Sequence, residues 1–179
     1  MKKQFTLIAL SAALVAPAFA NGFYVGADMG RTKLEVSDDM VGGHRYDDSW
    51  ALTGGYQFND HIAAELSYRS LSKLNQQYGS WNINHKLNAV EASAVGTFPL
   101  SDKFALFGRV GVVHVKGKST IRDGSTVEVE SDSKNRAMLG MGVRYAITQN
   151  VGLRSEYIRY AKMDDVAIST LTFGADYRF

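Results

Sequence analysis

The chain contains no cysteine and only two prolines in its 179 residues. Without cysteine, neither a disulfide framework nor a thiolate metal site is possible. After the first twenty positions there is no apolar stretch of the about 18 residues that a membrane-spanning helix requires. The i, i+3, i+4, i+7 spacing of amphipathic helices is also missing from every long segment. These absences leave strands as the main element of the fold.

The N-terminus has the three-part layout of a secretory signal. Two lysines precede an apolar run over residues 5–16, and Ala18 and Ala20 then supply small residues at the two positions that a signal peptidase reads. We predict a cleaved signal peptide over residues 1–20, with the cut before Asn21, and one mature domain over residues 21–179. The alternative is a transmembrane helix, but the apolar run is shorter than the about 20 residues that crossing a bilayer requires.

The predicted mature chain has no excess of either charge sign. Residues 1–20 contain two of the 20 lysines and arginines and none of the 18 aspartates and glutamates, so the remainder is neutral. A neutral balance argues against a nucleic-acid partner, because proteins that bind nucleic acid usually carry a basic excess. The four histidines are too dispersed for a metal site, and we expect no cofactor.

The mature chain does contain alternation of apolar and polar residues with a period of two, which is typical of β-strands with one apolar face. Eight segments alternate in this way: residues 23–30, 50–58, 62–69, 90–98, 104–112, 139–145, 151–160 and 171–179. One face of these segments carries no charge. The other face carries five acids and five arginines, which are Asp28, Glu65, Arg69, Glu91, Arg109, Arg144, Arg154, Glu156, Asp176 and Arg178.

A soluble β-sandwich would alternate in the same way, and three further features distinguish the two folds. Short turn-forming connections alternate with polar segments near residues 31–48, 70–85, 116–135 and 162–165. The charged face is rich in Gly, Ser and Thr, which suits the narrow interior of a small barrel. Aromatic residues on the apolar face gather near strand ends, as in the interfacial girdles of membrane barrels. We predict an all-β fold, an eight-stranded antiparallel up-and-down transmembrane β-barrel.

Three segments resemble the transmembrane domain of OmpA-type proteins: GGYQFNDHIAAELSY over residues 54–68, GVRYAITQNVGLRSEY over residues 142–157, and LTFGADYRF at the C-terminus. The opening GFYVGADMG resembles the opacity-type and Neisserial surface protein A-like barrels. The resemblance implies an outer-membrane protein of a Gram-negative bacterium with both termini in the periplasm and four extracellular loops. It says little about activity, because one fold hosts unrelated functions.

The C-terminal segment resembles the signal that the outer-membrane assembly machinery reads. Its alternating apolar residues include Leu171, Phe173, Tyr177 and the terminal Phe179. The alternative is that a last strand simply needs apolar residues on its outward face. Because the chain stops on Phe179, we expect it to lack the peptidoglycan-binding domain that full-length OmpA proteins carry after the barrel.

The inward charges could form a selectivity filter or a structural ion-pair network. We favour the network, because side chains fill the lumen of an eight-stranded barrel and the arginine fork binds carboxylates well. In the resemblance, Glu65 and Arg154 match members of the ion-pair cluster of OmpA-type barrels. Arg144 stands where that family has a carboxylate, so we expect a different pairing scheme here.

The polar segments supply the remaining candidates. Tyr78 and Trp81 are candidate contacts for a carbohydrate or protein ligand, and a mobile hydrophilic cap is the alternative. The only cluster with a catalytic composition is His44 with Asp47, Asp48 and Ser49, and loops collect such residues for solubility alone.

These features predict a monomeric, non-enzymatic outer-membrane barrel that presents loops for surface interaction or adhesion, or that supports envelope integrity. A narrow pore for small solutes and a lipid-modifying enzyme are the alternatives. The expected partners are outer-membrane lipids and lipopolysaccharide, the barrel-assembly machinery during biogenesis, and a host or surface ligand.

Overall fold

The computed structural model describes residues 22–36, 43–78, 81–123, 126–162 and 166–179. Its elements are eight strands: β1 (Phe23–Val36), β2 (Gly43–Gln57), β3 (Ile62–Tyr78), β4 (Trp81–Pro99), β5 (Phe104–Asp123), β6 (Thr126–Ala146), β7 (Val151–Tyr160) and β8 (Val166–Arg178). No helix in the described residues is long and apolar enough to cross a membrane. The predicted all-β class is confirmed.

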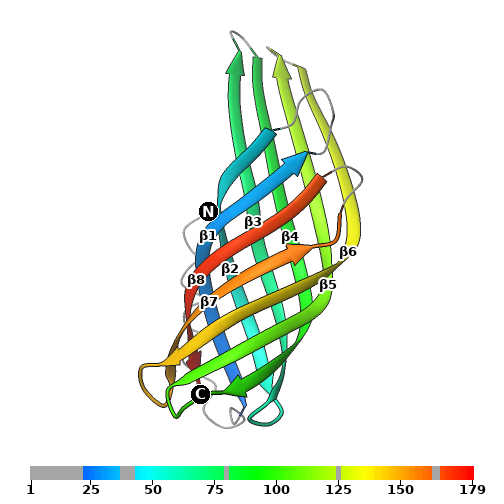
Figure 1. The fold of residues 1–179 in the computed structure, drawn as a ribbon. Helices are drawn as coiled ribbons and strands as arrows, with labels where there is room; N and C mark the ends of the chain where they lie inside the picture. Colours follow the sequence, from blue (N-terminus) through cyan, green and yellow to red (C-terminus); the bar gives the residue numbers. More distant parts are fainter. Residues whose placement is uncertain (1–21, 37–42, 79–80, 124–125, 163–165) are drawn as a thin grey trace.

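The strands form a closed barrel in sequence order (Figure 1). Every neighbouring pair is antiparallel, and β1 closes the barrel by pairing with β8 as well as with β2. Ala27, for example, lies between Leu52 of β2 and Ala175 of β8. The predicted eight-stranded, up-and-down antiparallel barrel is therefore confirmed.

The alternation of the sequence corresponds to the two faces of the barrel wall, because successive side chains of a strand point to opposite sides. On the outside, Met29 is 72% exposed and Phe173 is 61% exposed. On the inside, Tyr24 and Asp28 of the same strand β1 are buried. Outward aromatic rings meet across neighbouring strands, as Trp50 and Tyr68 do with centroids 5.8 Å apart.

The polar segments that the sequence suggested as long connections are mostly strand. β3 and β4 stay paired up to Tyr78 and Trp81, and β5 and β6 up to Asp123 and Thr126. The backbone hydrogen bonds continue there, but the alternation of apolar and polar residues fades. A sheet with polar residues on both faces has no apolar stripe to reveal it in the sequence. Periodicity therefore underestimated the lengths of these strands.

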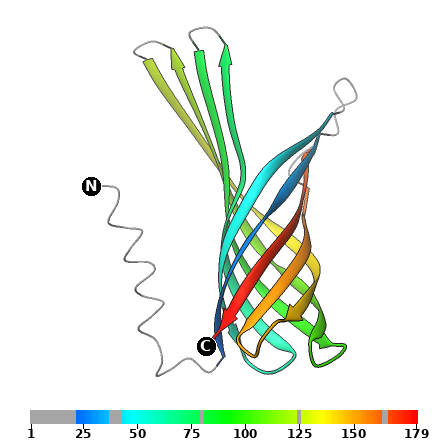
Figure 2. The same ribbon diagram turned by 90° about the vertical axis from the view of Figure 1, so that its left-hand side faces the viewer.

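Strands β3 to β6 extend well beyond the other four and project from the barrel as a continuation of its wall (Figure 2). The last pair between β2 and β3 is Trp50 with Ser70, and the last pair between β6 and β7 is Met138 with Tyr160. A register shift at residues 70–72 inserts one extra residue into β3 where that strand leaves the closed barrel. Such a bulge bends a strand and redirects its side chains. We call residues 72–78, 81–87, 116–123 and 126–136 together the protruding sheet.

Candidate functional site in the barrel interior

The interior of the barrel collects all ten charges of the polar face. Nine of them are buried, and Arg178 at the end of β8 is half-buried. Every strand except β2 contributes at least one of these charges. In β2, Thr53 accepts a hydrogen bond from Arg154 Nη2 at 3.2 Å. The alternation of the eight strands therefore brings together oppositely charged side chains such as Asp28 and Arg154, which are 126 positions apart in the chain.

Arg69 and Arg154 bind the carboxylate of Asp28 from two sides. Arg69 Nη1 lies 2.8 Å from Asp28 Oδ1, and Arg154 Nη2 lies 3.0 Å from Asp28 Oδ2. Arg69 Nε also donates to Glu91 Oε1 at 3.0 Å. Arg154 Nη1 reaches Glu65 Oε1 at 3.3 Å. Each guanidinium therefore bridges two carboxylates, a geometry to which the planar fork of arginine is suited.

Arg109 links Glu65 to Glu156, the fourth acid of this group. It donates through Nη2 to Glu65, and its Nε lies 2.9 Å from Glu156 Oε1. The second contact is an ion pair without a hydrogen bond, because the N–H is not directed at that oxygen. Glu65, which contacts both Arg109 and Arg154, is thus at the centre of the group.

Two tyrosines complete the central group by hydrogen bonds to its carboxylates. The Tyr24 hydroxyl donates to Glu65 Oε1 at 2.6 Å, and the Tyr160 hydroxyl donates to Glu91 Oε1 at 2.6 Å. Both tyrosines are buried. Buried charges need such additional donors, because an unpaired lone pair in the interior is costly.

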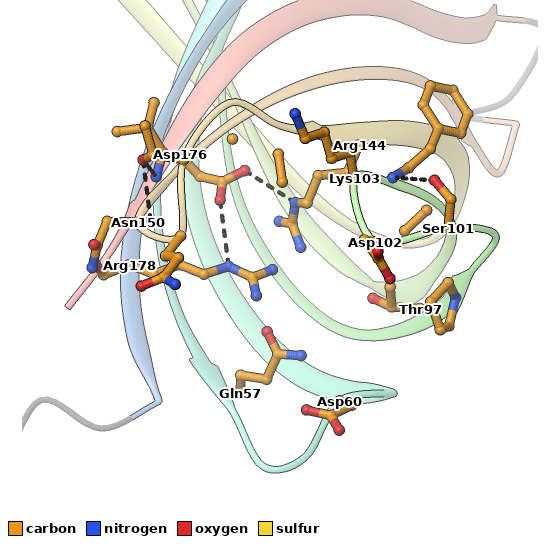
Figure 3. Close-up of a pocket in the computed structure, with 18 residues that line it drawn as sticks. Gln57, Asp60, Thr97, Ser101, Asp102, Lys103, Arg144, Asn150, Asp176 and Arg178 are labelled. Atoms are coloured by element: carbon orange, nitrogen blue, oxygen red, sulfur yellow. Dashed lines mark hydrogen bonds and ion pairs between the residues drawn. The ribbon is translucent and has the colours of Figure 1, made fainter.

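A second, smaller group lies at the end of the barrel that carries the short turns (Figure 3). Arg144 Nε donates to Asp176 Oδ1 at 3.0 Å, and Arg178 Nε lies 3.7 Å from Asp176 Oδ2. Both guanidinium groups also lie over the ring of Tyr24. A polar pocket of about 310 Å³ opens beside them. Arg144, which stands where OmpA-type barrels have a carboxylate, is therefore paired with Asp176 on β8.

The ten charges balance over the whole interior but not within each group. The central group contains four carboxylates and three guanidinium groups, whereas the group at the short turns contains one carboxylate and two guanidinium groups. The lumen is therefore slightly negative at its centre and positive at this mouth.

An apolar cluster fills the interior toward the protruding sheet, and the sequence reasoning missed it. Its buried members are Leu71, Ala89, Val113, Val115, Met138, Ile158, Tyr160 and Ile168. The sequence did contain a sign of this cluster. In β5, Val113 and Val115 lie at even spacing from the inward-facing Arg109, and in β7 Ile158 is two residues after the inward-facing Glu156. The interior is thus charged in one part and apolar in the next.

The cluster with a catalytic composition in the first polar segment lies only partly within the described residues. Arg31 of β1 lies 3.7 Å from Asp48 on the exposed outer face. Ser49 is buried, and the side chain of His44 lies outside the described residues. Within the described residues, no group of three His, Asp or Glu side chains could hold a metal ion.

The other candidate residues lie at the ends of the fold. Tyr78 and Trp81 pair at the far end of the β3–β4 hairpin, and their side chains lie outside the described residues, as do Ala20 and Asn21. The aromatic residues of the last strand face outward, and the rings of Tyr177 and Phe179 meet edge to face at 5.3 Å.

A family model described as the outer membrane protein beta-barrel domain matches residues 5–179. Outer membrane protein A of Shigella flexneri is 26% identical over an alignment that covers the whole chain but only 56% of that relative, so the chain spans about half its length. The attachment invasion locus protein of Yersinia enterocolitica is 27% identical over 76% of this chain and 69% of its own.

Among solved structures, Neisserial surface protein A has the same fold, with a TM-score of 0.67 and 24% identity over 89% of this chain and 99% of its own. The matched family model and the name of the Shigella relative both refer to the outer membrane, in agreement with the apolar outer wall and the closed antiparallel barrel. The chain belongs to the outer membrane protein beta-barrel domain family.

Proposed function

We propose that this protein is a non-enzymatic surface protein that uses its protruding sheet to bind partners outside the cell, and that its barrel is the anchor. The protein would be exported with residues 1–20 removed, and the short turns and the C-terminus would face the periplasm. The observation that carries the proposal is the continuation of β3–β6 beyond the closed barrel.

The protruding sheet has two edges with no paired strand among the described residues. Residues 72–78 of β3 pair only with β4, and residues 126–135 of β6 pair only with β5. An exposed edge is a template for an additional strand, and extended peptides bind to sheets in this way. The edges therefore support binding of a partner's extended segment through backbone hydrogen bonds.

Basic residues add a second feature to the same sheet. Lys73, Lys86 and Lys118 occupy one row of neighbouring register positions across β3, β4 and β5. Three lysines in a row favour an anionic partner surface. The name of the Yersinia relative, an attachment invasion locus protein, supports attachment as the kind of activity.

The lumen supports a structural role better than a pore. Its charges are buried and bound to one another, and the apolar cluster follows them along the interior. Aqueous channels usually require 16–18 strands, whereas side chains fill eight-stranded barrels. We infer that the ion pairs and the apolar cluster hold the wall together.

Adherence of bacteria that express the protein to cultured epithelial cells tests this function. The test variant lacks residues 73–76, 83–86, 118–121 and 128–131, which are mutually paired. Removing four pairs from each hairpin preserves both the register and the in–out parity of the strands. We expect adherence to fall to the level of cells without the protein, at equal amounts of folded barrel.

A full-length variant with Lys73, Lys86 and Lys118 replaced by glutamine is the matched control for length. If the partner binds through the sheet edges, this variant keeps most of the adherence. If the partner is an anionic surface that the lysines bind, this variant loses adherence. Wild-type adherence from the shortened barrel would contradict a surface-binding role and favour support of envelope integrity.

A further inference from the structure

The pocket of about 310 Å³ at the short-turn end of the barrel has charges of both signs, arranged in two zones. Its volume is near the lower end of the ~300–1,000 Å³ range of ligand pockets, so it suits a small solute. The inner zone is lined by Arg144, Asp176 and Arg178 (Figure 3). The rim carries three exposed charged residues, which are Asp60, Asp102 and Lys103.

Asp176 fixes both arginines of the inner zone through one edge of each guanidinium group. The hydrogen bond and ion pairs found for these two arginines within the described residues all run through Nε, so their Nη groups have no protein partner. Figure 3 shows the Nη groups pointing toward the middle of the pocket. The side chain of Arg144 is only 10% exposed, so the wall of the barrel holds this donor in place. Two such forks side by side suit a carboxylate.

The positive charge of the inner zone is not neutralised from elsewhere in the protein. A layer of buried apolar side chains lies between this zone and the central ion pairs: Tyr24, Ala63, Val95 and Phe107. In β5, for example, Phe107 is two residues nearer the short turn than Arg109 of the central group. The three short connections at this end are described in full, and residues 1–21, outside the described part, contain no aspartate or glutamate. Two guanidinium groups and one carboxylate therefore leave one net positive charge.

The rim has the opposite balance, because Asp60 and Asp102 outnumber Lys103. Among the ion pairs of the described residues, none joins either of these aspartates to Arg144 or Arg178. A purely anionic ligand would meet like charge as it passed the rim, which is unfavourable. A ligand with a carboxylate at one end and a cation at the other matches both zones.

We propose that this mouth binds a small zwitterion of the amino-acid or dipeptide class. The carboxylate would bind the Nη groups of Arg144 and Arg178, and the ammonium group would face Asp60 and Asp102. The apolar layer closes the pocket toward the lumen, so the ligand would be held at the mouth and not conducted. The site lies at the opposite end of the barrel from the protruding sheet, so it holds or fails independently of the proposed surface binding.

Titration of the purified barrel with alanylalanine in nonionic detergent, followed by NMR chemical shifts, tests the site. The test variant is Arg178→Gln, in which Arg144 Nε still binds Asp176 and preserves the fold. We expect its Kd to rise at least about tenfold, because hydrogen bonds to charged groups are among the stronger ones. The matched control is Arg31→Gln, which removes an exposed arginine outside the pocket. Its Kd should stay within about twofold of wild type, too small a change for a lost charged contact.

Two modified dipeptides test each end of the ligand on the wild-type protein alone. The C-terminally amidated dipeptide lacks the carboxylate and should bind at least about tenfold more weakly. The N-acetylated dipeptide lacks the ammonium group and should bind about two- to fivefold more weakly, because exposed ion pairs contribute less.

Ala146→Trp tests the pocket itself. Ala146 is a half-buried residue of the lining, and a large ring there should weaken binding of alanylalanine while both arginines remain. Heat-modifiable mobility on gels confirms that each variant is folded. Three results would overturn the proposal: no saturable shift with the wild-type protein, an unchanged Kd for folded Arg178→Gln, or equal binding of either modified dipeptide.

Discussion

Tyr24 of β1 reaches across β2 to hydrogen-bond Glu65 of β3, with 2.6 Å between its hydroxyl and Oε1. Gly55 of the intervening strand makes this possible, because a Cβ atom there would lie 2.6 Å from the Tyr24 hydroxyl. Gly54, its neighbour, faces outward, and a Cβ atom there would meet nothing within 4 Å. The glycine of the inner face therefore makes room for the link between a buried tyrosine and the ion pairs.

Replacing Gly55 with alanine should therefore displace Tyr24 and weaken its bond to Glu65. Overpacking of this kind typically costs about 1–3 kcal/mol, so the urea midpoint of the barrel in lipid should fall. Gly54→Ala is the matched control and should leave stability unchanged or raise it by up to about 1 kcal/mol, because glycine within a strand is unfavourable. Equal midpoints for the two variants would contradict the role of Gly55.

The apolar cluster predicts a contrast between two methionines of β6. Met138 is 1% exposed inside the barrel, whereas Met141 is 70% exposed on its outer wall. Met138→Ala leaves a cavity and should cost about 2–5 kcal/mol in the free energy of unfolding. Met141→Ala leaves no cavity and should cost about 1 kcal/mol or less. Chemical denaturation in lipid vesicles measures both, and a larger loss at Met141 would place the packed interior elsewhere.

Deletion of Phe179 should affect assembly of the barrel in the outer membrane, and not only the stability of the folded protein. Its backbone N–H donates to the Phe23 carbonyl at 3.1 Å, which joins the two ends of the barrel wall. Deleting Phe179 should reduce the heat-modifiable, folded band in outer membranes. Phe58→Ala is the comparison, because Phe58 is another exposed aromatic residue beside a short turn. Equal folded amounts from both variants would count against an assembly signal at the C-terminus.

Much of the fold follows from one physical rule, that side chains of a strand alternate between two environments. The rule placed Asp28 and Arg154 on the face that the structure turns inward, and Met29 and Phe173 on the face that it turns outward. The closure between β1 and β8 followed from the barrel class, since an open antiparallel edge would be unsatisfied in lipid.

What could not be predicted lies where that rule loses its signal. In the protruding sheet both faces are mostly polar. The alternation over residues 126–130 suggested that this hairpin continues above the membrane, but nothing in the sequence indicated that β5 runs as far as Asp123. The partners of each arginine were equally hidden, because the register between strands decides that Arg69 meets Asp28 and Glu91. The apolar cluster was missed because the inner face was taken to be polar throughout, although Val113 and Val115 share the parity of Arg109.

Arg154→Ala addresses the role of the ion pairs. The substitution leaves Asp28 and Glu65 each with one fewer cation in a buried position. Breaking a buried pair typically costs about 3–5 kcal/mol, and water that enters the lumen would reduce that cost. A clear fall of the urea midpoint is expected. Arg31→Ala, which removes an exposed arginine of the outer face, should change the midpoint by less than about 1 kcal/mol.

Planar-bilayer recording of the wild-type protein and of Arg154→Ala tests the closed lumen most directly. A barrel whose interior is filled by ion pairs and by the apolar cluster should give only background current, and the less stable variant should do the same while it remains folded. Reproducible single-channel steps from the wild type, with an ion selectivity that Arg154→Ala alters, would contradict a structural interior and establish a pore.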